Sequence, residues 1–330
     1  MRRFKVHAKW SGSEPAAASV SRGRNRYGTG AAAVAVRALP PGVRSSVLFS
    51  LMVLAWSGNY LFVRVGLASA SPLWLATLRA AAGSAGVGLY LLLSQPTSTL
   101  RSRDRRDALL LGLPNTAAFL GLWFVAAGSV AAGEAAVVIY TFPLWVALFS
   151  VPALGRHLGR AHWVAVAAGF AGVVLVSEPW STSLKGVPIL PFGELLGAAV
   201  CWAGATVVFQ RRFQPEQLAS ANGLQLFGGS LALAAMAIVW DHGQLPHPTA
   251  SLGLSVLWLG LFGTAFAYVV WFWLLGRQAA STLSAYTFLV PLGALGLAVI
   301  FQGESVGLGQ AVGVVLVLLG VYAVARASRP

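Results

Sequence analysis

Residues 112–128 read GLPNTAAFLGLWFVAAG, and a related stretch, GLFGTAFAYVVWFWLLG, stands 148 residues further along the chain at 260–276. Both stretches are almost wholly apolar. Among the residues of the first copy that the second repeats at the same spacing are Gly112, Thr116, Trp123, Phe124 and Gly128. A match of this kind indicates an internal repeat, so we expect a fold of two related halves.

The repeat extends through most of the chain. At the same offset Pro143 falls on Pro291, and at an offset of 146 residues Trp56 falls on Trp202. Because Trp56 and Trp202 recur in both halves, we assign them to the scaffold that the halves share.

The composition indicates a membrane protein. The chain of 330 residues is 57% hydrophobic and 10% charged, with a mean hydropathy of +0.73, whereas about a quarter of the residues are charged in an ordinary soluble domain. An apolar stretch of roughly 17 to 25 residues can cross a bilayer as a helix. The predicted fold is an all-α integral membrane protein with ten transmembrane helices, at about 45–67, 72–94, 107–128, 131–153, 161–177, 192–210, 218–240, 251–276, 281–301 and 306–325.

Five spans in each half force the second half to enter the membrane upside down. Lysine and arginine concentrate in the first 44 residues and in loops on the same side, such as RSRDRR at 101–106, and these residues mark the cytoplasmic side. We therefore predict a multi-pass protein of the cell inner (plasma) membrane with both termini in the cytoplasm. Two inverted five-helix repeats are typical of secondary transporters.

The same pattern divides the chain into three regions. Residues 1–43 are basic and lack a long apolar run, which indicates a disordered tail outside the fold. The two five-helix repeats are expected at 44–178 and 192–326. The net charge of +14 lies mainly in the tail and the loops, which argues against a nucleic-acid partner and leaves the lipid bilayer and a small molecule. Small residues in the fifth and tenth spans allow close helix packing and a homodimer.

Several segments resemble a known family. Residues 264–320, which begin TAFAYVVWFWLLG, closely resemble the second repeat of EamA-type transporters of the drug/metabolite transporter superfamily. WSGNYLFVR at 56–64 and VAAGEAAVVIYTFPLWVALF at 130–149 resemble the first repeat. The resemblance implies an EamA-like basket of ten helices with a substrate cavity between the halves, through which small metabolites are exported or imported.

Polar residues within the spans are the first candidates for substrate binding, because polar groups in a membrane are costly unless they face the protein interior. Asn59 and Tyr60 lie in the first span and do not recur in the second half. They can line the substrate site or form hydrogen bonds between helices. Arg79 lies in the second span, where it can bind an anionic substrate or reach the membrane surface with its long side chain.

Aromatic residues in the spans are the second set of candidates. Aromatic walls with a few polar groups suit small organic ligands, although tryptophan and tyrosine also gather at membrane surfaces. The residues that we predict to bind substrate are Trp123, Tyr140, Tyr268, Trp271 and Tyr286.

Glu134, Pro143 and Pro291 are candidates for the transport mechanism. Glu134 can couple transport to protons through its carboxyl group, or it can stabilise the amino terminus of a helix. Each proline removes a backbone donor from its span. The pair can therefore act as two hinges beside the site or as static kinks.

We expect no enzymatic activity, no cofactor and no metal. The single cysteine, Cys201, excludes a disulfide framework and a thiolate cluster. No histidine can pair with a serine inside the membrane, since all five lie in the tail or in or near loops: His7, His157, His162, His242 and His247.

The sequence therefore predicts a secondary transporter of small organic metabolites or drugs that works by alternating access and exports its substrate. A flippase for lipids or lipid-linked sugars is the alternative, and a channel a more distant one. Unequal residues in the two halves, such as Arg79 against Gln225, favour a single off-axis site over the rings of like groups that line a channel.

Overall fold

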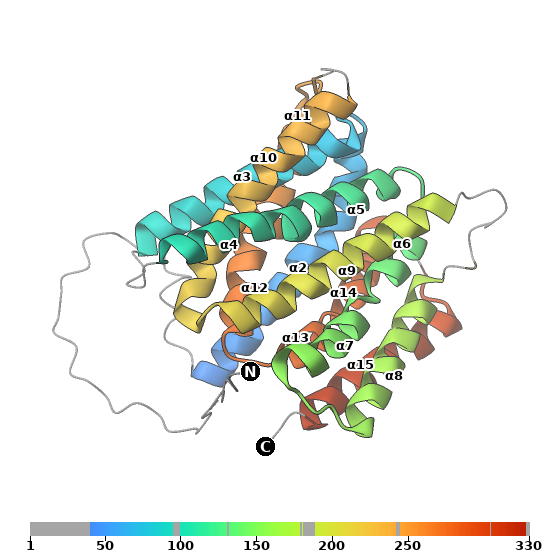
Figure 1. Cartoon of the computed structure of the whole chain (residues 1–330). Helices are drawn as coiled ribbons and strands as arrows, with labels where there is room; N and C mark the ends of the chain where they lie inside the picture. The colour runs from blue at the N-terminus through green and yellow to red at the C-terminus, as the bar shows by residue number, and fades with distance from the viewer. Residues whose placement is uncertain are drawn as a thin grey trace. The chain divides into compact units, whose positions relative to one another are not determined.

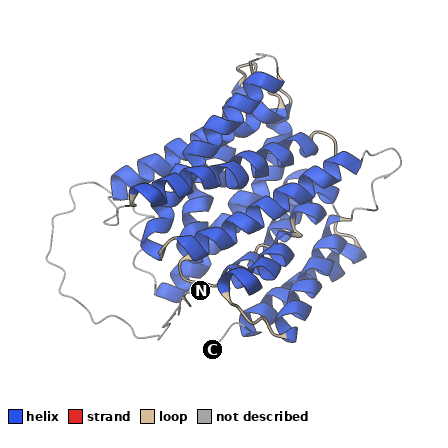
Figure 2. Cartoon of the chain, viewed as in Figure 1, coloured by secondary structure: helices blue, strands red, loops and turns tan. Residues whose placement is uncertain are grey.

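The computed structural model describes residues 40–94, 100–130, 132–178, 180, 189–241, 245–303 and 305–327. The predicted tail at 1–43 lies outside these residues except for its last four. All regular secondary structure in the described residues is helical (Figure 2). Ser45–Pro330 forms one compact unit, shown in Figure 1.

The prediction of ten membrane-crossing helices is confirmed. In the described part of the chain, ten segments are long and apolar enough to cross a membrane: Gly42–Leu67, Pro72–Ser94, Ser102–Ala127, Glu134–Leu154, Arg160–Ser177, Ile189–Arg212, Pro215–Trp240, Ala250–Leu275, Ala280–Phe301 and Leu308–Ala327.

Six of these spans follow one helix for most of their length. These helices are α2 (Pro41–Leu67), α3 (Pro72–Ser94), α8 (Arg160–Ser177), α9 (Ile189–Arg212), α10 (Leu218–Trp240), which a short 3₁₀ turn η3 (Pro215–Gln217) precedes, and α15 (Leu308–Ala327).

The other four spans are irregular, and the irregularities occur at matching places in the two halves. The third span consists of α4 (Ser102–Gly112), the π-helical segment η1 (Leu113–Ala118) and α5 (Phe119–Ala127). The eighth has the same plan, with α11 (Ala250–Leu257), η4 (Trp258–Phe266) and α12 (Ala267–Leu275). The fourth and ninth spans are broken, into α6 (Ala132–Ile139) and α7 (Phe142–Leu154), and into α13 (Ala280–Tyr286) and α14 (Leu289–Gln302).

Both breaks lie just before the recurring prolines. Pro143 and Pro291 fall in the first turn of α7 and of α14, where a helix needs no backbone donor. We expected each proline near the middle of its span, as a hinge or as a static kink. The helix ends just before each proline and restarts, so that the prolines lie in the first turn of new helices.

The two halves contact each other through a pair of corresponding close approaches. A methyl group on Gly83 in α3 would collide with Thr264 in η4, and one on Gly229 in α10 would collide with Thr116 in η1. Gly83 and Gly229 correspond in the repeat, as do the two threonines. Each half therefore holds the other through the same contact, which supports the predicted repeat.

The fifth and tenth spans, α8 and α15, lie side by side (Figure 1). A methyl group on Gly172 would lie 2.7 Å from the carbonyl oxygen of Gly313, and one on Gly320 would lie 2.6 Å from the backbone nitrogen of Gly169. Small residues thus let these two helices approach closely, as in other membrane bundles.

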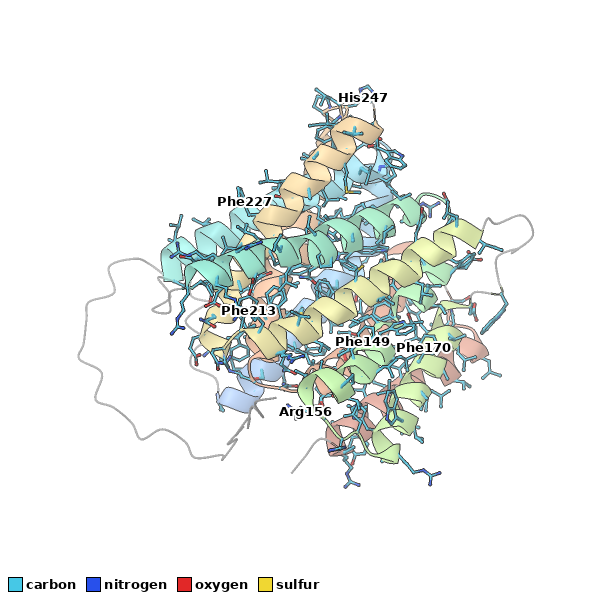
Figure 3. The ribbon with its side chains drawn as sticks, viewed as in Figure 1. Phe149, Arg156, Phe170, Phe213, Phe227 and His247 are labelled. Carbon is cyan, nitrogen blue, oxygen red and sulfur yellow. The ribbon has the colours of Figure 1, made fainter. Side chains whose placement is uncertain are left out.

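Large apolar side chains cover the outside of the bundle (Figure 3). Phe227, which the figure labels, is 51% exposed, and Leu92 and Ile300 are 76% and 74% exposed. An apolar surface of this extent fits a lipid environment rather than water. The structure agrees with a multi-pass membrane protein.

We expect Gly229→Ala to destabilise the fold. The added methyl group would force α10 and η1 apart, and overpacking of this kind costs about 1–3 kcal/mol. The measurement is the melting temperature of the detergent-purified protein. Gly88→Ala is the matched control, because the space beside Gly88 in α3 is open. Equal melting temperatures for the two variants would show that the close approach does not restrain the helices.

Candidate functional site

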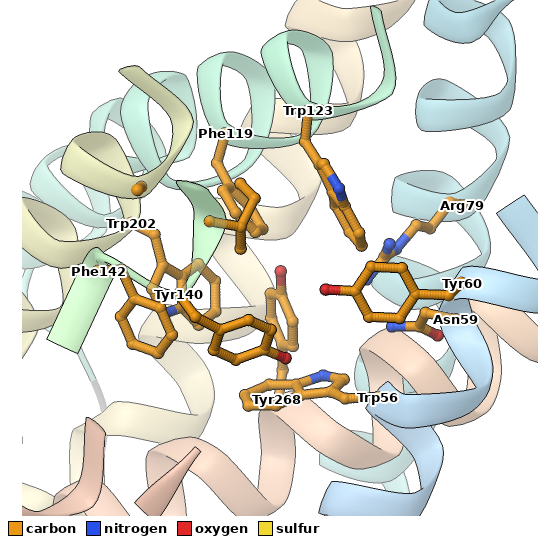
Figure 4. Close-up of a pocket in the computed structure, with 12 residues that line it drawn as sticks. Trp56, Asn59, Tyr60, Arg79, Phe119, Trp123, Tyr140, Phe142, Trp202 and Tyr268 are labelled. Atoms are coloured by element: carbon orange, nitrogen blue, oxygen red, sulfur yellow. The ribbon is translucent and has the colours of Figure 1, made fainter. Parts of the chain in front are cut away.

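A cavity of about 60 Å³ lies between the two halves (Figure 4). Nine of its 12 lining residues come from the first half: Trp56, Asn59, Tyr60, Arg79, Phe119, Trp123, Ile139, Tyr140 and Phe142. The second half contributes Ala199, Trp202 and Tyr268. The lining is mostly aromatic, with a few polar groups.

The irregular segments bring several of these residues together. Phe119 follows η1 directly, and Tyr268 is the second residue after η4. Ile139, Tyr140 and Phe142 surround the break between α6 and α7. Irregular backbone at membrane depth is tolerated where it is buried or lines a cavity. The position of these segments beside the cavity therefore accounts for their irregular backbone.

The π-helical segment η4 lies behind the lining and holds several of the lining residues in place. Trp56 and Arg79 both donate hydrogen bonds to the carbonyl oxygen of Gly263, from Nε1 at 3.1 Å and from Nη2 at 3.4 Å. Gly263 has no side chain, and a methyl group there would collide with Asn59. Gly263 thus fixes three lining residues through its carbonyl group and its small size.

Arg79 lies inside the protein and not at its surface. The residue is 1% exposed, so its side chain does not reach the membrane surface. Its Nε atom donates a hydrogen bond to Thr264 Oγ1 at 3.0 Å, and its guanidinium carbon lies 5.1 Å from the ring centre of Trp123. Its Nη1 atom is buried without a hydrogen-bond partner in the protein.

The aromatic rings form a connected wall around Trp202. The ring centres of Phe119 and Tyr268 lie 4.8 Å and 5.1 Å from that of Trp202, and the ring of Trp56 lies 6.3 Å away. A flat apolar group between these rings would be in contact with aromatic surface on several sides.

Polar atoms among the lining residues are left without partners. Three buried atoms have no hydrogen bond within the protein: Asn59 Oδ1, Arg79 Nη1 and Tyr268 Oη. Each such atom costs about 1–3 kcal/mol when nothing satisfies it. Asn59 Oδ1 packs against Gly263, so Tyr268 Oη and Arg79 Nη1 are the two donors among these atoms that a bound molecule can pair with.

The structure brings six of the predicted substrate residues together around the cavity: Asn59, Tyr60, Arg79, Trp123, Tyr140 and Tyr268. Trp271 and Tyr286 lie outside its lining. Trp271 packs behind the wall, with its ring centre 5.6 Å from that of Trp56, and Tyr286 packs against Phe49 at 5.9 Å. These two residues support the bundle and do not face the cavity.

The mechanistic candidates also lie outside the lining. Glu134 is 3% exposed in the first turn of α6, a position that suits an acid in either of its two predicted roles. Pro143 and Pro291 flank the breaks in the fourth and ninth spans. Their roles as coupling group and hinges stay predictions.

Six lining residues were not among the predicted candidates: Trp56, Phe119, Ile139, Phe142, Ala199 and Trp202. Trp56 and Trp202, which the sequence analysis assigned to the shared scaffold, also line the cavity. Their recurrence did not reveal this, because Trp271, the counterpart of Trp123 in the repeat, lies outside the lining.

A metal site is not formed by the described residues. No three of their His, Cys, Asp and Glu side chains gather closely enough to hold an ion. None of the described residues that line the cavity is acidic.

Comparisons with known proteins agree on a family. A model described as the EamA-like transporter family matches residues 44–178 and 193–326. The uncharacterized transporter YvbV of Bacillus subtilis is 27% identical over 292 residues, which cover 88% of this chain and 94% of that protein. The uncharacterized inner membrane transporter YedA of Escherichia coli is 29% identical over 284 residues, which cover 83% and 90%.

A solved crystal structure shares the fold. It superposes with a TM-score of 0.72 at 20% sequence identity, over 85% of this chain and 98% of that chain.

The cavity predicts a difference between two adjacent alanines. In a Cys201→Ser background, which removes the single native cysteine, Ala199→Cys should react with a small methanethiosulfonate reagent faster than Ala198→Cys. Both positions are buried, but Ala199 alone of the two lines the cavity. Mass spectrometry on the purified protein measures the labelling rate of each variant. Equal rates would contradict an accessible cavity beside Ala199.

Proposed function

The chain belongs to the EamA-like transporter family, and we propose that it moves small organic metabolites or drugs through the cavity between its halves by alternating access. Its ten apolar helices indicate a multi-pass membrane protein, and its relatives are named transporters. Beyond membership of this family, we propose the site, the mechanism and the class of substrate.

One observation carries the proposal: both halves build a single cavity at the places where their helices are irregular. The first half supplies most of the polar groups, and the second half supplies Trp202 and Tyr268. A site that both halves share can be exposed to one side of the membrane or the other when the halves rock against each other.

The corresponding glycine–threonine contacts support alternating access. Gly83 packs on Thr264 and Gly229 packs on Thr116, so the halves meet at two corresponding surfaces. In an inverted repeat, exchange of the conformations of the two halves converts an outward-open form to an inward-open one. The broken spans beside Pro143 and Pro291 offer positions where the helices can bend during that exchange.

The lining supports a small, largely flat organic substrate. Aromatic rings surround the cavity, and its volume of about 60 Å³ requires the rings to separate as a larger molecule enters. We propose export as the direction because the family resemblance favours it. We also propose that the protein acts as a carrier without catalysis, in contrast to a channel or a flippase.

We expect Trp202→Ala to reduce transport about tenfold or more, because it removes the ring that joins the aromatic wall. The substrate is found first, by comparing metabolites inside and outside cells with and without the protein. Export predicts lower internal and higher external levels of that metabolite. Saturable uptake with counterflow in proteoliposomes then measures the wild type and the variant.

Trp240→Ala is the matched control for this substitution, because Trp240 is 74% exposed at the end of α10. Transport by this variant should equal that of the wild type. Elution of both variants as single peaks from a sizing column checks that they fold. A folded Trp202→Ala variant with wild-type transport would refute the cavity as the substrate site, and single-channel conductance would favour a channel.

Proton coupling through Glu134 predicts that Glu134→Gln abolishes the dependence of transport on an imposed pH gradient. The carboxyl group can bind and release a proton, whereas the amide cannot. Uptake in proteoliposomes with and without the gradient measures the effect. Unchanged rates and an unchanged pH dependence would leave Glu134 with the stabilising role at the start of α6.

A further inference from the structure

We infer that the substrate is a small organic anion, in which one carboxylate pairs with Arg79 and a flat apolar body carries no ammonium group. The inference rests on the proposed function and concerns the same cavity. It follows from the buried cation, from its counterpart in the other half and from the absence of acidic side chains in the described lining.

The positive charge of Arg79 is buried without a counter-ion among the described residues. No described carboxylate forms an ion pair with it, and its Nη1 atom has no hydrogen-bond partner in the protein. Its neighbours are neutral: the hydroxyl of Thr264, the carbonyl of Gly263 and the face of Trp123. A buried charge is strongly unfavourable until it is paired, so an anion that enters the cavity gains this interaction.

The other half shows that packing does not require the charge. Gln225 corresponds to Arg79 in the repeat, and it accepts a hydrogen bond from Thr116 Oγ1 at 2.6 Å. Arg79 makes the corresponding contact with Thr264. At one of the two contacts between the halves a neutral glutamine makes the hydrogen bond to threonine, and at the other an arginine makes it. The hydrogen bond therefore does not explain why Arg79 carries a charge.

The neighbouring hydroxyl groups suit a carboxylate. In Figure 4 the guanidinium of Arg79 lies beside Trp123, Tyr60 and Asn59, and the hydroxyl of Tyr60 points into the cavity. The Tyr268 hydroxyl is buried without a partner. A carboxylate has several lone pairs and can accept from Nη1 and from a phenol together. Charge-assisted bonds of this type are among the stronger hydrogen bonds in proteins.

The same lining disfavours an ammonium group. None of the described lining residues is acidic, and Arg79 repels a second positive charge. An amine would find aromatic ring faces and neutral phenol oxygens as partners, but no negative charge. The cavity should therefore bind a simple carboxylate more tightly than a zwitterion that carries the same ring.

The test uses four probes that share a phenyl ring: phenylacetate, its neutral amide, 2-phenylethylamine and phenylalanine. Uptake of each into proteoliposomes is measured at neutral pH, with protein-free liposomes as the blank. The wild type should take up phenylacetate at least about tenfold faster than the other three, as expected for one charge-assisted interaction. This preference in the wild type tests the substrate class without any variant.

Arg79→Gln recreates the arrangement of the other half without the charge. It should fold and lose the preference for phenylacetate. Thr116→Val, which removes the hydrogen bond to Gln225, is the matched control and should keep the preference. A wild type that moves the amide, the amine or phenylalanine as fast as phenylacetate, or that moves none of the four, overturns the inference, and so does a preference that survives Arg79→Gln. The proposed function is decided separately, by the metabolite comparison and the Trp202→Ala variant.

Discussion

Close contact between a glycine of one half and a threonine of the other, made twice, is the constraint on which the structure around the cavity depends. Gly83 receives Thr264, and Gly229 receives Thr116. Because the helices approach so closely, each threonine hydroxyl reaches a long polar side chain on the facing helix: Arg79 in one case and Gln225 in the other. The contact therefore sets both the packing and the position of the buried charge.

The irregular helices follow from the same arrangement. In η4 the hydroxyl of Thr264 donates to the carbonyl of Leu259, five residues earlier, at 2.8 Å, which matches the wider π-helical turn. The Gly263 carbonyl in the same segment accepts from Trp56 and Arg79. These polar backbone and side-chain groups of η4 and its neighbours thus satisfy one another inside the bundle, while large apolar side chains face outward. A bilayer imposes this separation on any protein that spans it.

The spans could be predicted because length and apolarity alone decide them, and polar residues such as Asn59 and Arg79 could be assigned to the interior because lipid excludes them. Which face of an apolar helix meets the cavity could not be predicted. Trp123 and Trp271 take matching places after η1 and η4, but only Trp123 lines the cavity, since the two halves contribute unequally to it. Pro143 and Pro291 were expected as hinges or static kinks within their spans, and the helix breaks just before each of them. Trp56 and Trp202 were assigned to the shared scaffold because they recur, and recurrence alone did not reveal that they also line the cavity.

The proposed transport depends on a small molecule that binds in the cavity between the halves, with its charge at Arg79. Crystals of the protein soaked with 4-bromophenylacetate would locate such a molecule through the anomalous signal of bromine. We expect one bromine peak among the rings around Trp202, with density for the carboxylate beside the guanidinium of Arg79. A well-occupied peak only at another place, or a ligand whose carboxylate points away from Arg79, would contradict it.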